Sequence, residues 1–220
     1  MITQIYEANN LNETRSLVEA GVDYIGVLVG IQGKYPGELN PEQAKEVLRG
    51  VTGQSKKVIL PFSENLKDIS LIISKTNPDI VHIAVEPDAF LPLDVQVLKK
   101  QFPNIKIMRT IPVVDEKSVE LAKQYDRIAD YILLDSRSKK NNQLGVTGET
   151  HDWNLSKEIV ESVSISVILA GGLGVDNVAE AILKVKPFGV DSKTKTDRIG
   201  TNEKDIKKVK EFVRIAKATK

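Results

Sequence analysis

Two carboxylates and a pair of glycines are the residues of this chain whose types and spacing best suit chemistry. Asp135 and Asp191 each end a short apolar run, and between them the run Val167–Ala170 ends in Gly171-Gly172. A carboxyl group can donate or accept a proton. Adjacent glycines let backbone N–H groups approach an anion closely, above all where a helix begins. The pattern therefore predicts a site that binds a phosphorylated small molecule and performs acid–base chemistry.

Basic residues near the same segments could neutralise an anion. Lys193 and Lys195 follow Asp191, where they could meet a phosphate, although solvated lysines are the alternative. Arg109 lies near the end of an earlier apolar run. We expect Arg109 either to contact the substrate or to pair with Asp135, and such a pair would favour the ionised carboxylate.

Each of these features also has a purely structural interpretation. The glycine pair could form only a tight turn, and either aspartate could cap a loop or take part in an ion pair. A dinucleotide-binding fingerprint is a further alternative, because Asp191 follows Gly171 by 20 residues. That fingerprint needs a third glycine where Asn177 stands, and only one strand is expected after it. We therefore favour the anion site.

No metal or cofactor is predicted. The sequence contains no cysteine, which excludes disulfides, thiolate catalysis and cysteine-ligated metals. The two histidines, His82 and His151, do not have the spacing of metal ligands. We interpret His82 as a structural histidine, and a place in the lining of the barrel is the alternative.

The charge and hydropathy of the chain favour a small molecule as its partner. The 220 residues carry 31 basic and 30 acidic side chains, a net charge of +1. This balance gives no electrostatic reason to expect nucleic acid or a membrane as a partner. No apolar run approaches the roughly 20 residues of a membrane helix, and the N-terminus lacks a secretory signal pattern. We expect a cytoplasmic protein, and the sequence leaves oligomer formation open.

A regular framework must position these residues, because short β-branched runs alternate with stretches of helical period from end to end. Strict alternation indicates parallel strands joined by helices. Eight such units predict an α/β fold of the closed (β/α)8 TIM barrel type, formed by residues 1–220 as one domain. An open doubly wound sheet is the alternative. The expected strands are Ile2–Tyr6, Tyr24–Val29, Lys57–Leu60, Ile80–Ala84, Ile105–Ile111, Tyr131–Leu134, Val167–Ala170 and Phe188–Asp191.

The ends of these strands define where a site would form. In such a barrel the catalytic groups gather at the C-terminal ends of the strands and in the loops that follow. Side chains alternate inward and outward, so Gln4 and Tyr6 share one face of the first strand. Together with the two aspartates they predict a polar ring at one mouth of an apolar barrel.

Six segments have the sequence pattern of a known enzyme family: Gly21–Val29, Leu133–Ser136, Thr147–Trp153, Leu169–Leu173, Asn177–Ile182 and Pro187–Asp191. Through them the chain resembles, over nearly its whole length, the phosphoribosylanthranilate isomerase family of tryptophan biosynthesis. The resemblance implies a barrel of the ribulose-phosphate-binding type and an intramolecular oxidoreductase, an aldose–ketose isomerase that performs an Amadori rearrangement. It implies that Asp135 is the general acid, and that Gly171-Gly172 and the loop after Asp191 hold the phosphate.

The departures from the family pattern concern the base and the phosphate loop. The family has Lys-Ile-Cys-Gly on its first strand, with cysteine as general base, and this chain has Gln4-Ile5-Tyr6-Glu7. Tyr6 is a poor base near neutral pH, because the reference pKa of tyrosine is about 10. Glu7 or Asp191 could replace it, although strand alternation turns Glu7 away. The family's Ser-Ser-Gly turn is Lys193-Thr194-Lys195 here, and Lys34 could meet the anthranilate carboxylate.

Three hypotheses follow. The first is an isomerase acting on phosphoribosylanthranilate or a related phosphoribosyl amine. The second is a non-catalytic paralogue that binds a phosphorylated ligand. The third is an isomerase or lyase acting on a different sugar phosphate.

Overall fold

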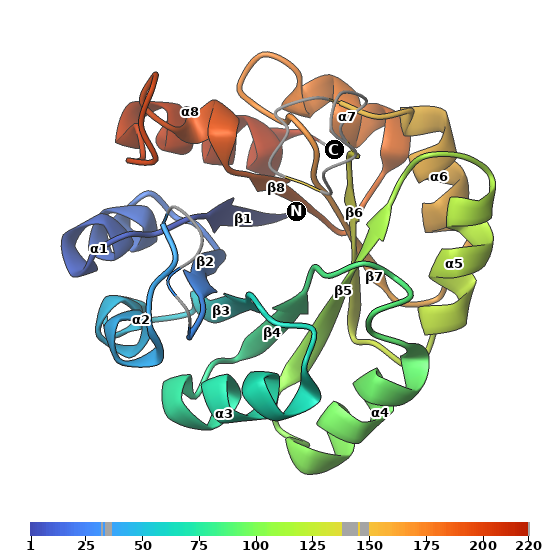
Figure 1. The fold of residues 1–220 in the computed structure, drawn as a ribbon. Coiled ribbons are helices and arrows are strands. Elements are labelled where there is room, and N and C mark those ends of the chain that lie inside the picture. The colour runs from blue at the N-terminus through green and yellow to red at the C-terminus, as the bar shows by residue number, and fades with distance from the viewer. Residues whose placement is uncertain (32, 34–36, 138–144, 146–149, 220) are drawn as a thin grey trace.

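Strands and helices alternate along the chain, and the strands close into a barrel in the order β1 to β8 (Figure 1). The computed structural model describes residues 1–31, 33, 37–137, 145 and 150–219. Every pair of neighbouring strands is parallel. The strands are β1 (Ile2–Tyr6), β2 (Tyr24–Val29), β3 (Lys56–Pro61), β4 (Ile80–Ile83), β5 (Lys106–Pro112), β6 (Tyr131–Asp135), β7 (Ser166–Leu169) and β8 (Gly189–Ser192).

Helices surround this barrel as an outer ring (Figure 1). Several begin at a residue that accepts a backbone N–H group. Asn40, for example, forms a capping box with Gln43, and Pro41 takes the first helical position, where its missing N–H costs nothing. The helices are α1 (Leu11–Glu19), α2 (Pro41–Leu48), α3 (Leu66–Thr76), α4 (Pro92–Gln101), α5 (Lys117–Tyr125), α6 (Trp153–Ser162), α7 (Val178–Val185) and α8 (Ile206–Ala218).

Closure of the barrel decides between the two predicted architectures. β1 pairs with β8, so that Gln4 lies beside Asp191, and an open sheet would leave both of these strands as edges. The (β/α)8 prediction is therefore confirmed, and the open doubly wound sheet is wrong. Among the described residues, no helix has both the length and the apolar character needed to cross a bilayer.

Alternation along the strands divides the buried side chains into two cores. Outward residues such as Ile5 and Val27 pack with helical residues such as Leu17 and Phe212. The inward residues form a separate apolar cluster inside the barrel. The polar inward residues lie above this cluster, at one mouth of the barrel. Its buried members are Tyr6, Tyr24, Leu28, Val58, Ile80, Met108, Leu133, Ile168 and Ala170.

Candidate active site

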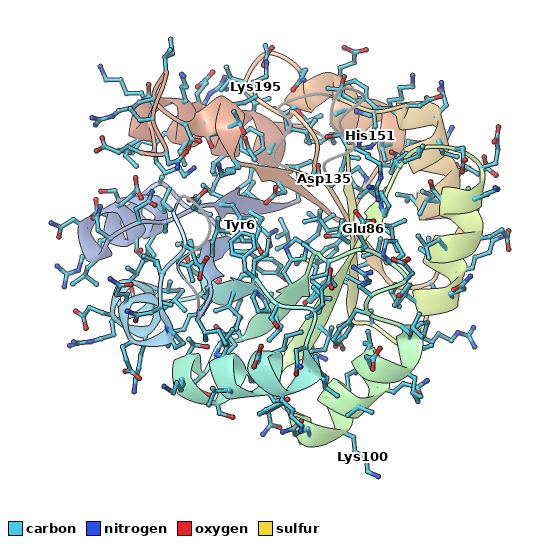
Figure 2. The ribbon with its side chains drawn as sticks, viewed as in Figure 1. Tyr6, Glu86, Lys100, Asp135, His151 and Lys195 are labelled. Atoms are coloured by element: carbon cyan, nitrogen blue, oxygen red, sulfur yellow. The ribbon has the colours of Figure 1, made fainter. Side chains whose placement is uncertain are left out.

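A cavity opens at the C-terminal ends of the strands, above the inner apolar cluster. Figure 2 shows Tyr6 and Asp135 toward the middle of the ring of helices, whereas Lys100 lies on its outer rim. Strand ends and loops from both halves of the chain supply the cavity wall. Its polar and glycine lining includes Tyr6, His82, Thr110, Asp135, Gly145, Gly171, Gly172, Asp191, Ser192, Lys193, Thr194 and Lys195.

Tyr6, His82 and Thr110 form a buried chain of hydrogen bonds across three strands. The Tyr6 hydroxyl oxygen lies 2.8 Å from His82 Nδ1, and His82 Nε2 lies 2.6 Å from Thr110 Oγ1. Burial, helped by the positive charge of Arg109, lowers the pKa of His82 to about 3, so the imidazole is neutral. One ring nitrogen then carries a hydrogen and the other accepts one, and the contacts with Tyr6 and Thr110 fit either tautomer.

The same surroundings keep Tyr6 protonated. Burial, and then the nearby charge of Asp191, raise the pKa of Tyr6 well above its ordinary value. A base must lose its proton before it can remove one from the substrate. Tyr6 is therefore a protonated phenol hydrogen-bonded to His82, and the structure gives no support to its predicted catalytic role as a base.

Asp135 stands at the end of β6 with one oxygen held and the other close to the following loop. Its Oδ1 accepts the backbone N–H of Ser136 at 2.7 Å. Burial raises the pKa of Asp135 to about 6, although the Ser136 hydrogen bonds oppose that shift. A side-chain carbon built on Gly145 would lie 2.6 Å from Oδ2, so the loop backbone covers this carboxyl group closely. A carboxyl group with such a pKa can exchange a proton near neutral pH.

Asp191 faces the same cavity from β8. Its Oδ1 accepts a hydrogen bond from Gln4 Nε2 at 3.0 Å. Burial raises the pKa of Asp191 to about 8. The Gln4 hydrogen bond and the charge of Lys204 oppose this shift, and the charge of Asp135 adds to it. Asp135 ionises first, and between the two pKa values the pair of carboxyl groups holds one proton.

Two loops join in the cavity wall at the position where the sequence predicts an anion site. Gly171 and Gly172 both have left-handed backbone, with φ of 82° and 61°. A side-chain carbon on Gly171 would lie 2.8 Å from His151 Nδ1, so only glycine fits there. Ser192 Oγ donates to the Leu173 carbonyl oxygen at 2.7 Å and links this turn to the loop after β8.

The loop after β8 brings its lysines to the same cavity. A short 3-10 helix, Thr194–Thr196, follows β8, and both Lys193 and Lys195 line the wall beside the glycine turn. The glycine pair, Asp191 and Lys193 are therefore brought together, as a phosphate site at the barrel mouth requires.

Glu7 lies beside this site without lining the cavity. The carboxylate is 1% exposed, and its Oε2 lies 3.0 Å from Lys193 Nζ. An ion-paired carboxylate outside the cavity is poorly placed to take a proton from a bound substrate. Of the two predicted replacements for the missing cysteine, the structure favours Asp191, which faces the cavity, over Glu7.

Arg109 lies outside the cavity. The prediction that it contacts the substrate or pairs with Asp135 is therefore wrong. Thr110 points into the barrel, so its neighbour on β5 points outward into the region between sheet and helices. The fully buried guanidinium donates to the carbonyl oxygens of Ile83, Val85 and Glu86 at 3.0, 2.9 and 3.1 Å. Arg109 thus fixes the chain that leaves β4.

The remaining site residues are two that were predicted and two that were not. Lys34, proposed to meet a substrate carboxylate, lies outside the described residues. His82 was interpreted as structural but lines the cavity, and Thr110 and Ser192 were not predicted. Strand alternation could have identified Thr110. Neighbouring residues of a strand point in opposite directions, so Thr110 and Arg109 cannot both face the interior. Among the described residues, no cluster of three or more possible metal ligands occurs.

Comparisons with known proteins agree with this geometry. A model of the N-(5′-phosphoribosyl)anthranilate (PRA) isomerase family matches residues 4–215. The chain is 34% identical over 204 residues to the N-(5′-phosphoribosyl)anthranilate isomerase of Methanocella arvoryzae, with 91% of each chain covered.

Solved structures show the same fold. Monomers of the dimeric phosphoribosylanthranilate isomerase from Thermotoga maritima share 25% identity and a TM-score of 0.79, over 99% of this chain and 100% of theirs. A phosphoribosylanthranilate isomerase in complex with reduced 1-(o-carboxyphenylamino)-1-deoxyribulose 5-phosphate has a TM-score of 0.79 at 24% identity, with 99% and 100% covered. With the family match spanning nearly the whole chain, this protein belongs to the N-(5′-phosphoribosyl)anthranilate isomerase family.

Proposed function

We propose that this chain isomerises phosphoribosylanthranilate to the corresponding 1-amino-1-deoxyribulose 5-phosphate. The observation that carries the proposal is the placement of two carboxyl groups, Asp135 and Asp191, in one cavity whose end is lined by Gly171, Gly172 and Lys193. An aldose-to-ketose rearrangement needs one group that gives a proton and another that takes one. A phosphate anchor at one end would hold the sugar between them.

In the proposed reaction, Asp135 acts first and Asp191 acts second. Asp135 donates a proton to the ribose ring oxygen, the C1–O bond breaks, and the nitrogen lone pair forms a protonated Schiff base. Asp191 then removes the C2 proton, and the electron pair of that C–H bond forms the C1–C2 double bond of an enolamine. Reprotonation at C1 and loss of the hydroxyl proton at C2 give the ketone. Both steps need the proton of the singly protonated pair on Asp135 and the charge on Asp191. The pKa values of about 6 and about 8 place that proton mainly on Asp191 in the free chain, so the reactive form is the minor one of the two.

The catalytic role predicted for Tyr6 is replaced by one in shaping the cavity. Its hydroxyl is engaged by His82, and its ring forms part of the wall. The phosphate end is proposed to use the backbone of Gly171 and Gly172 together with the charges of Lys193 and Lys195. We propose no cofactor and no metal, and we retain as predictions a single domain over residues 1–220, oligomer formation and a cytoplasmic location.

Turnover of synthetic phosphoribosylanthranilate by the purified chain tests this proposal. We expect conversion to the aminoketose phosphate, and a loss of about 10²–10⁴ in kcat for Asp135→Asn and for Asp191→Asn. Glu180→Gln, a change on the exposed surface of α7, is the control and should leave kcat unchanged. Wild-type protein that binds the substrate and never converts it would contradict the proposal.

That negative result has its own interpretation, because Tyr6 occupies the position of the family's base in a form that keeps its proton. A non-catalytic paralogue would still be stabilised by sugar phosphates, by about 2.7 kcal/mol at a ligand concentration 100 times Kd. Thermal unfolding with ribulose 5-phosphate therefore separates a binding protein from one that recognises neither substrate nor phosphate.

A further inference from the structure

We propose that Glu7 is a positioning residue that competes with a bound phosphate group for the ammonium group of Lys193, and thereby sets how tightly the cavity holds a phosphate monoester. The proposal rests on the proposed function only for the phosphate end of the cavity. It does not depend on whether the chain performs the isomerisation.

The ion pair joins the end of β1 to the loop after β8. Glu7 Oε2 lies 3.0 Å from Lys193 Nζ, and the two side chains are 1% and 15% exposed. Lys193 lines the cavity, whereas Glu7 lies behind it. The lysine thus extends between the carboxylate and the space in which a phosphate would lie.

The Glu7 carboxylate is buried, and only one of its two oxygens is known to have a partner. Its Oε1 is buried and has no hydrogen-bond partner among the described residues. A side-chain carbon built on Gly37, whose φ is 78°, would lie 1.6 Å from this oxygen, so the loop backbone lies directly over it. Burying a carboxylate with one free oxygen is unfavourable. Such a group is retained where its charge acts on a neighbour, and Lys193 is the neighbour it meets.

The ion pair between Glu7 and Lys193 affects the affinity for phosphate because the same ammonium group would contact both anions. A lysine ammonium has three N–H donors, so it can hold Glu7 and still donate to a phosphate oxygen. The carboxylate nevertheless offsets part of the positive charge that the phosphate would meet, and the low dielectric of the site strengthens this effect. Affinity for phosphate is therefore lower than the glycine turn and the lysines alone would give, which lets a phosphorylated product leave.

A role for Glu7 as the catalytic base makes the opposite prediction. Removing a base lowers kcat and leaves the affinity for inorganic phosphate unchanged. Removing a competitor changes the affinity for phosphate, and it does so only while Lys193 is present. Direct binding measurements on a double-mutant cycle therefore distinguish the two roles.

The experiment measures the Kd of inorganic phosphate by calorimetry at about pH 8, where the dianion dominates. Glu7→Gln keeps the shape and an acceptor for Lys193, and we expect it to lower Kd about threefold or more. Lys193→Met should raise Kd about fivefold or more, and Glu7→Gln/Lys193→Met should match Lys193→Met alone. Glu86→Gln is the control, because Glu86 pairs with Arg137 at the same mouth and should leave Kd unchanged.

Three results would overturn the proposal. They are an unchanged or raised Kd in Glu7→Gln, an equal gain in affinity on the Lys193→Met background, and a similar gain in Glu86→Gln. Should Glu7→Gln not fold, Glu7→Asp draws the carboxylate away from Nζ and must also lower Kd. Turnover of phosphoribosylanthranilate by the wild type is measured separately, so failure of the proposed activity cannot be mistaken for failure of this inference.

Discussion

The hydroxyl oxygen of Tyr6 on β1 lies 2.8 Å from Nδ1 of His82 on β4, so the two side chains meet inside the barrel. His82 is neutral, and its other ring nitrogen contacts Thr110 at 2.6 Å, so the three side chains form one buried hydrogen-bonded chain. The position at which the family pattern has a reactive thiol therefore holds a phenol that keeps its proton and is hydrogen-bonded to His82.

Tyr6→Phe should separate packing from proton transfer at this position. The change keeps the ring and removes the hydroxyl, leaving His82 Nδ1 without its hydrogen-bond partner. We expect the free energy of unfolding to fall by about 1–2 kcal/mol and kcat/KM to fall less than about tenfold. Urea denaturation and steady-state kinetics measure both. A loss of kcat of about 10²–10⁴ would restore Tyr6 as the base.

Activity should depend on pH as a bell-shaped curve whose limbs reflect the aspartate pair. The pKa values of about 6 for Asp135 and about 8 for Asp191 place the singly protonated pair between them. Because the Gln4 hydrogen bond lowers the pKa of Asp191, Gln4→Leu should move the alkaline limb of kcat/KM to higher pH. An alkaline limb that stays in place would show that another group controls it.

Stability should fall with pH because of the same aspartate. The pKa of Asp191 is about 8 in the folded chain, against about 3.9 for an unfolded aspartate. The folded chain binds this proton more tightly, so the stabilisation is full below about pH 4 and is lost as pH rises toward 8. Asp191→Asn should therefore lose less stability than the wild type between pH 5 and 8 in urea denaturation. Equal slopes for the two proteins would count against a raised pKa.

Gly171→Ala tests the glycine turn as an anion site. The new methyl group would meet His151 Nδ1 at 2.8 Å, on backbone with φ of 82°. We expect KM for the phosphorylated substrate to rise about tenfold or more, since a displaced turn misplaces its N–H groups. Gly53→Ala is the matched control, because Gly53 also has positive φ, 67°, but nothing lies within 4 Å. It should lose about 1 kcal/mol of stability and no affinity.

Arg109→Met should destabilise the fold without altering the chemistry. The change leaves the buried carbonyl oxygens of Ile83 and Val85 without the donor they now share. We expect a loss of about 3 kcal/mol in the free energy of unfolding. At a temperature where the variant is folded, kcat/KM should match the wild type. A rise in KM with little loss of stability would instead support the original expectation that Arg109 contacts the substrate.

The sequence was sufficient for features that depend on period and position along the chain. Strand–helix alternation predicted the closed barrel, and the ends of apolar runs placed Asp135 and Asp191 at its mouth. The 3-10 helix at Thr194–Thr196 was not predicted, since three residues carry no periodicity to detect.

Features that depend on the direction of a side chain were harder to obtain. Arg109 was placed in the site because it lies near a strand end, although its neighbour Thr110 takes the inward position. The contact between Glu7 and Lys193 joins residues 186 positions apart in the chain, and no local pattern signals it. Tertiary geometry alone also showed that His82 is hydrogen-bonded to the Tyr6 hydroxyl.

The hydrogen bond from Ser192 to the Leu173 carbonyl has a consequence for recognition. It connects the glycine turn after β7 to the end of β8, from which the lysine loop continues. The conformational entropy lost in holding these two segments together is thus part of folding the barrel. The phosphate group that we propose as ligand would therefore meet segments already joined, and its binding free energy would not be reduced by joining them.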